Sequence, residues 1–85
     1  MNILGVYDNK GKTLDRYTVV YDYVEQVKDG KKLYMCISMN ASPFHPQGIG
    51  MHGSAMLGRH LGKKVKLTDL PEDCQKAVAM DLKDE

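Results

Sequence analysis

Residues 17–39 read YTVVYDYVEQVKDGKKLYMCISM, and this stretch decides the fold class. Every second side chain from position 33 to position 39 is apolar, which is the period of a strand with one face in the core. Residues 17–24 also alternate, but both of their faces are partly apolar, so we expect this strand at the centre of the sheet. The pair Asp29-Gly30 between the two strands favours a tight hairpin turn. The stretch therefore predicts a β-hairpin.

The flanking sequence extends this hairpin into an α+β fold. Residues 3–7 are apolar and partly β-branched, and residues 64–67 form a short alternating run, so both predict strands. Near the C-terminus, Asp69 can cap a helix over 69–85, and Pro71 suits its first turn. Apolar residues then recur at spacings of three and four. We expect one domain over residues 1–85, with a small antiparallel sheet of three to four strands and one C-terminal helix.

A long loop rich in glycine and proline separates the hairpin from the C-terminal elements. No Asp, Glu, Lys or Arg occurs between positions 33 and 58, and from position 40 onward Pro43, Pro46 and four glycines interrupt any regular pattern. Loops of this length are uncommon in a small domain and are usually either functional or disordered. Its apolar residues argue for order, so we expect an ordered, functional loop over 40–62.

Composition excludes several classes of partner. Twelve Lys and Arg residues against eleven Asp and Glu give a net charge of +1 in 85 residues, so no overall attraction to nucleic acid or anionic lipid is expected. The uncharged stretch contains too many polar residues and prolines for a membrane span. The N-terminus does not resemble a secretory signal, so a cytoplasmic location is expected. Cys36 and Cys74 are expected as unpaired core thiols.

Four segments resemble a family of small proteins encoded by bacteriophages and prophages. They are DRYTVV at 15–20, PFHPQG at 43–48, HLGK at 60–63 and DLPEDCQ at 69–75, and the similarity extends over residues 13–82. The resemblance implies a phage accessory protein that acts in the cytoplasm of a bacterial host. It carries over no catalytic residue.

The loop contains one motif associated with phosphate binding. Residues 48–53 read GIGMHG and match G-x-G-x-x-G, which lets backbone amides approach a pyrophosphate. A dinucleotide-binding fold would place this motif directly between a strand and a helix, and here two prolines intervene. A weaker interpretation is a loop whose amides bind an anion. The alternative is that the glycines only permit tight turns.

Basic residues follow the loop without any acidic residue among them. Residues 59–66 include Arg59, His60, Lys63, Lys64 and Lys66. Beside a glycine-rich loop, such cations suit a phosphorylated small molecule. The alternative is a solvated strand face whose cations are balanced by the acidic helix.

The three histidines, His45, His52 and His60, all lie in or just beyond the loop. Their spacing matches no common metal-ligand motif, so no metal or other cofactor is expected. The loop also contains no carboxylate that could orient an imidazole for acid–base catalysis. Histidines that order the loop or contact a ligand are the favoured interpretation, and no catalytic residue is assigned.

The leading hypothesis is a non-enzymatic protein that binds a small phosphate-bearing ligand, such as a host signalling nucleotide. Arg16 is a further possible contact, and the candidate ligand-binding residues are His45, Gln47, Gly48, Gly50, His52, Gly53, Arg59, His60 and Lys63. A second hypothesis is a protein–protein interaction module that uses the apolar loop residues, for example Phe44 and Ile49, against a host or phage protein. A third is a small enzyme that uses His52 or His60. The neutral loop could also be buried in a homo-oligomer.

Overall fold

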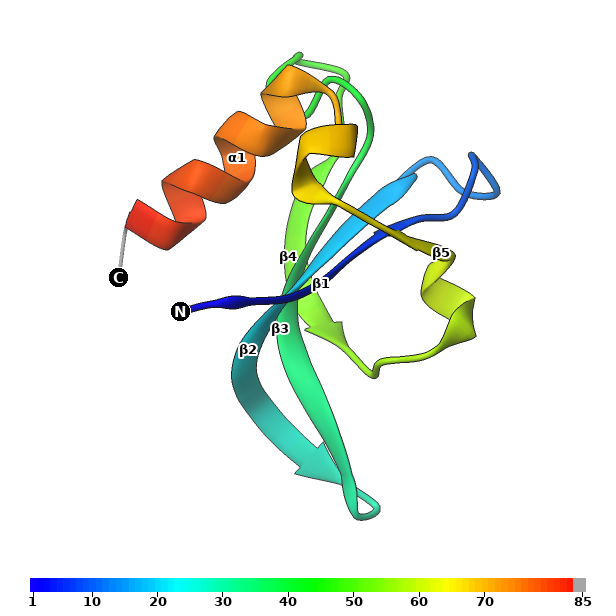
Figure 1. The fold of residues 1–85 in the computed structure, drawn as a ribbon, viewed down its shortest axis with the longest axis vertical. Coiled ribbons are helices and arrows are strands. Elements are labelled where there is room, and N and C mark those ends of the chain that lie inside the picture. Colours follow the sequence, from blue (N-terminus) through cyan, green and yellow to red (C-terminus); the bar gives the residue numbers. More distant parts are fainter. Residues whose placement is uncertain (84–85) are drawn as a thin grey trace.

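The computed structural model describes residues 1–83 and contains a five-stranded antiparallel sheet with one C-terminal α-helix (Figure 1). The strands lie side by side in the order β4-β3-β2-β1-β5, so β4 and β5 form the two edges. The elements in chain order are β1 (Ile3–Asp8), β2 (Tyr17–Lys28), β3 (Lys31–Met39), β4 (Gly50–Ala55), the 3-10 turn η1 (Arg59–Leu61), β5 (Lys63–Val65), the 3-10 turn η2 (Leu67–Asp69) and α1 (Glu72–Lys83). The α+β class is confirmed, but the sheet has five strands rather than three or four.

The central hairpin forms as predicted. Asp29 and Gly30 have φ angles of 53° and 76°, so both central residues of the turn are left-handed, as a type I′ turn requires. The pairing of β2 with β3 is irregular between Val20 and Val24, and residues beyond this point on β2 are exposed. Figure 1 shows this distal half of the hairpin extending away from α1. The expected central position of β2 is confirmed, although only its first five residues are buried.

The predicted long loop is wrong in one important respect, because it contains strand β4. This strand pairs with β3 from Gly50 opposite Met39 to Ala55 opposite Tyr34. Its sequence, GMHGSA, lacks β-branched residues and an apolar period, so local propensity does not identify it. Hydrogen bonding to the adjacent strand β3 makes it a strand nonetheless. The remaining irregular segments are residues 40–49 and residues 56–62, which connect β4 to β5 and contain η1.

The C-terminal elements differ in their boundaries from the prediction. Asp69 does not cap α1: its carboxylate accepts a hydrogen bond from the Lys66 amide at 3.0 Å and so closes η2. The helix instead begins after Pro71, whose carbonyl accepts the Gln75 amide at 3.1 Å. The predicted end of the helix at positions 84 and 85 lies outside the described residues. Among residues 1–83, every helix is too short or too polar to span a bilayer.

The core lies between α1 and one face of the sheet. Burial of apolar surface on both sides of this layer is the main stabilising contribution. The helix contributes Cys74, Ala77 and Val78, with Leu70 just before it, and the sheet contributes Val6, Tyr17, Val19, Tyr21, Ile37 and Met39. Cys36 and Cys74 are both free and buried, as predicted. Burial raises the pKa of both thiols, that of Cys74 to about 11.

Two methionines on neighbouring strands test this assignment of core and edge. Met39 on β3 is 0% exposed in the core, whereas Met51 on β4 is 62% exposed. Met39→Ala should lower the free energy of unfolding by about 2–5 kcal/mol because it leaves a cavity. Met51→Ala should change it by no more than about 0.5 kcal/mol. Urea unfolding of the two variants measures the difference, and equal losses would contradict the assignment.

Candidate functional site

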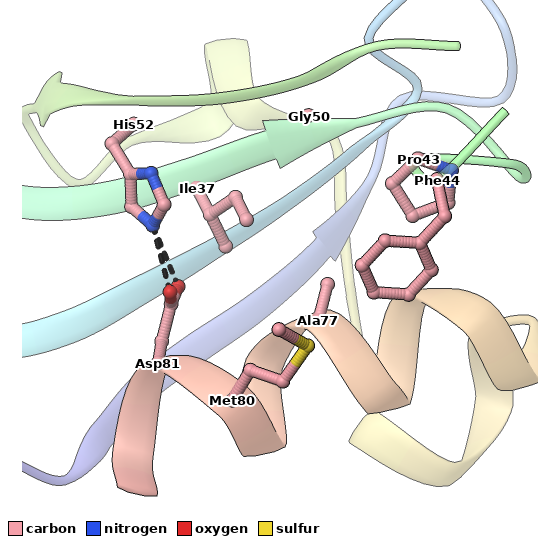
Figure 2. A pocket seen from close by; sticks show the side chains of 8 residues that line it. All are labelled: Ile37, Pro43, Phe44, Gly50, His52, Ala77, Met80 and Asp81. Atoms are coloured by element: carbon pink, nitrogen blue, oxygen red, sulfur yellow. Dashed lines mark hydrogen bonds and ion pairs between the residues drawn. The ribbon is translucent and has the colours of Figure 1, made fainter. Parts of the chain in front are cut away.

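A pocket of about 250 Å³ lies between the edge strand β4 and helix α1. We call it the β4–α1 pocket, and its lining residues are Ile37, Pro43, Phe44, Gly50, His52, Ala77, Met80 and Asp81. Figure 2 shows Pro43 and Phe44 at one end of the pocket and the pair His52–Asp81 at the other. The walls are therefore apolar along most of their length, with a polar group at one end.

The polar end is a hydrogen-bonded cluster drawn from three elements. The Nε2 atom of His52 on β4 lies 2.8 Å from Oδ1 and 2.9 Å from Oδ2 of Asp81 on α1. The Tyr21 hydroxyl on β2 donates to Asp81 Oδ2 at 2.7 Å. The side chain of Asp81 is 15% exposed, while that of His52 is 50% exposed. The Asp81 carboxylate is thus hydrogen-bonded by Tyr21 on its buried side and by His52 on its solvent-exposed side.

This arrangement determines what each group can do chemically. Because Tyr21 is fully buried and donates to Asp81, burial and the nearby carboxylate raise the pKa of its phenol well above the ordinary value, and the hydroxyl remains a donor. When His52 donates its Nε2 proton to Asp81, its Nδ1 becomes an acceptor. The cluster therefore offers a fixed carboxylate and one imidazole nitrogen to whatever enters the pocket.

The carboxylate partner of His52 comes from the helix. The loop itself contains none, as the sequence showed, but Asp81 is 29 positions further along the chain. One signal in the sequence points to it: Asp81 follows Ala77 by four residues and Val78 by three, so it lies beside the apolar stripe of α1. A carboxylate placed against a buried face needs hydrogen-bond partners. Here Tyr21 and His52 supply them.

The G-x-G-x-x-G segment is the entry to β4 rather than an open loop. Gly50 and Gly53 lie in the strand, and Gly48 lies two residues before its first residue. The Gly48 amide donates to the His45 carbonyl at 2.7 Å, so it is already used. None of the three glycines has a positive φ angle. A Cβ at Gly48 would overlap the Ser42 carbonyl oxygen, so here glycine is needed for close backbone packing.

The three histidines occupy three different elements. His45 lies in the turn before β4, where its Nδ1 accepts the Gln47 amide at 3.1 Å, and His60 lies in η1. Only His52 lines the β4–α1 pocket. Within residues 1–83, no three His, Cys, Asp or Glu side chains gather as a metal ion would require.

The predicted basic residues lie at the opposite edge of the sheet. Lys63 is paired with Asp8 in the β1–β5 ladder, and Arg59 and His60 lie in η1, just before β5. Strands β3, β2 and β1 lie between β5 and β4 in the sheet, and Arg59 and His60 lie in the segment that connects β4 to β5. The nine candidate residues therefore fall into two sets. His45, Gln47, Gly48, Gly50, His52 and Gly53 lie on or before β4, and Arg59, His60 and Lys63 lie on or before β5.

Arg16 is held by an acidic partner. Its Nε and Nη2 atoms donate to the two oxygens of Asp8 at 2.8 and 3.1 Å, and its guanidinium lies 5.1 Å from the centre of the Tyr17 ring. The hydrogen bond from Arg16 lowers the pKa of Asp8, and burial opposes this shift only in part. Arg16 therefore closes the β1–β2 loop, and its charge is already paired with the Asp8 carboxylate.

Comparison of the chain with protein-family models, with curated proteins and with solved structures gave no match.

The glycine segment yields a matched pair of variants. Gly48→Ala should lower the free energy of unfolding by about 1–3 kcal/mol or more, because the added methyl group collides with backbone. Gly53→Ala should remain within about 1 kcal/mol of the unmodified protein, since nothing lies within 4 Å of the added atom. Thermal unfolding measures both, and a destabilised Gly53→Ala would show that this glycine has a role that packing does not explain.

Proposed function

We propose that this protein is a non-enzymatic binding module. The surface formed by β4, the turn before it and α1 contacts a partner protein. The observation that supports this most directly is the β4–α1 pocket, an apolar hollow with exposed apolar side chains at its rim. Phe44 is 52% exposed and Met80 is 56% exposed, and both line the pocket. Pockets that receive one apolar anchor from a partner are typical of binding energy hot spots.

The size and charge of the pocket favour a protein over a phosphorylated small molecule at this position. Its volume of about 250 Å³ lies below the range of about 300–1,000 Å³ typical of pockets for drug-sized ligands. Its lining includes the Asp81 carboxyl group and no Lys or Arg, a composition that does not favour a phosphate. A single apolar side chain fits both the volume and the apolar walls.

The pocket also argues for binding rather than catalysis. His52 and Asp81 form a pair suited to general-base chemistry, but the other lining residues carry no hydroxyl, thiol or amine that could act as a nucleophile. An enzyme at this site would need water or the substrate to supply the nucleophile. The resemblance to small phage-encoded proteins is compatible with a binding role, in which the partner is a host or phage protein.

Substitutions at the rim of the pocket test the proposal. A tagged protein is used to capture partners from bacterial extract, and the retained protein is purified and titrated by calorimetry. Phe44→Asp and Met80→Asp should each weaken binding at least about ten-fold, as losses at interface hot spots do. Leu14→Asp is the control, because Leu14 is an exposed apolar residue (81%) on the β1–β2 loop, outside the pocket.

The result contradicts the proposal if both pocket variants bind the partner as tightly as the unmodified protein, or if Leu14→Asp weakens binding to the same extent. Circular dichroism checks that the variants fold.

A second candidate function, binding of a phosphate-bearing ligand, is favoured by the basic segment at the β5 edge. Arg59, Lys63, Lys64 and Lys66 occur there without an acidic residue between positions 59 and 66. This site would not include the glycines near β4, so it is smaller than the one expected from the sequence.

Calorimetry with inorganic pyrophosphate and a panel of nucleotides tests this second site. Arg59→Ala and Lys63→Ala should each weaken binding several-fold, because each removes a charge-assisted hydrogen bond. Lys31→Ala, at the tip of the β2–β3 hairpin, is the matched control. Absence of binding to every compound, or equal loss in the control, would rule the site out.

A further inference from the structure

We infer that the partner of the β4–α1 face contributes an extended segment that pairs with the free edge of β4 and places one apolar side chain in the pocket. This inference rests on the proposed function and specifies how the partner is recognised. It follows from three observations: the two sheet edges differ, the pocket adjoins one of them, and β4 cannot fill the pocket of a second copy.

The two edges of the sheet differ in how they are protected. An edge strand presents unpaired amide and carbonyl groups, which proteins usually shield with short length, charged residues, proline or a bulge. The β5 edge has three residues and carries Lys63 and Lys64. The β4 edge has six residues, no Asp, Glu, Lys, Arg or proline, and an uninterrupted register with β3.

The backbone of β4 is available on its outer side. Within residues 1–83, no backbone hydrogen bond from a turn or loop reaches positions 50–55, so the backbone–backbone hydrogen bonds of β4 are those of its ladder with β3. An incoming strand can therefore form the main-chain hydrogen bonds by which extended peptides add to a sheet.

The β4–α1 pocket lies beside this edge. His52 is opposite Ile37 of the core, so Gly50, His52 and Ser54 share the face of β4 that is turned toward α1. Directly opposed side chains on paired strands lie about 4.5–5.5 Å apart. A residue of the incoming strand opposite Gly50 would thus lie next to the pocket, beside Pro43, whose Cβ lies 3.3 Å from the position of a Cβ added at Gly50.

The chemistry of the pocket indicates the residue that enters. Phe44, Met80 and Ala77 surround the apolar end, which fits a Leu, Met or Phe side chain. The next residue on the same face, two positions along, would meet His52, whose Nδ1 can accept a hydrogen bond. The recognised segment is therefore extended, with an apolar residue followed two positions later by a hydrogen-bond donor such as Ser or Thr.

A second copy of this chain fits the edge poorly. If β4 paired with another β4, the residues offered to each pocket would come from Gly50, His52 and Ser54, and none of these is a large apolar residue. Both pockets would then stay unfilled. We therefore take the occupant to be a segment of a different protein.

A random nonapeptide library displayed on a carrier, selected against the full chain, supplies the probes for a test. We expect selected peptides to share an apolar residue and to slow amide hydrogen exchange at positions 50–55. Each selected peptide is then synthesised in two N-methylated forms. One form carries methyl groups on the alternate amides that would face β4, and the other carries them on the amides that point away from β4. Methylation of the edge that faces β4 should weaken binding at least ten-fold, and methylation of the opposite edge should change it less than three-fold.

Three outcomes would overturn the inference. Peptides that require Phe44 but tolerate methylation on both edges would show that the pocket binds side chains without strand pairing, which leaves the proposed function intact. Sedimentation as a dimer, with positions 50–55 protected before any peptide is added, would identify a second copy as the occupant. The inference is also rejected if every selected peptide binds the Phe44→Asp variant as tightly as the unmodified protein, or if no peptide is selected. The titration of the purified partner then tests the proposed function separately.

Discussion

The register between β3 and β4 is the constraint on which the rest of the structure depends. With His52 opposite Ile37, the imidazole lies on the face of the sheet that α1 covers and can reach Asp81. A shift of one residue would turn His52 to the other face, because side chains alternate along a strand. The pocket, its polar end and the position of the free edge all follow from this one pairing.

The cluster of Tyr21, Asp81 and His52 connects the core to the surface. The Tyr21 phenol is buried in the middle of the sheet, and its hydrogen bond orients a carboxylate that is mostly buried at the end of α1. Satisfying the carboxylate this way avoids the cost of an unpaired buried charge. The half-exposed His52 completes the arrangement. As a result, edge strand, central strand and helix are held together at one end of the pocket, and the turn before β4 and α1 together form its apolar end.

Sequence patterns predicted the parts of the fold that depend on local chemistry. The hairpin of β2 and β3 was predictable from alternation and from Asp29-Gly30, and the helix from its apolar stripe. Strand β4 was not, because an edge strand that contains Gly50, Gly53 and Ser54 has neither an apolar period nor β-branched residues. Of the nine predicted ligand-binding residues, Gly50 and His52 line the β4–α1 pocket, and their role in binding stays a prediction. Asp81, the partner of His52, was overlooked, since no spacing rule links residues that meet only when a helix packs on a sheet.

By itself the sequence determined the α+β class, the central hairpin, the unpaired core cysteines and the segregation of charge along the chain. The tertiary structure decided which residues act together. It placed the glycines and the basic residues of the predicted ligand site at opposite sheet edges, and it brought His52 to Asp81 across 29 positions. The physical reason is that strand order and helix docking are set by burial of apolar surface from the whole chain, which no local segment encodes.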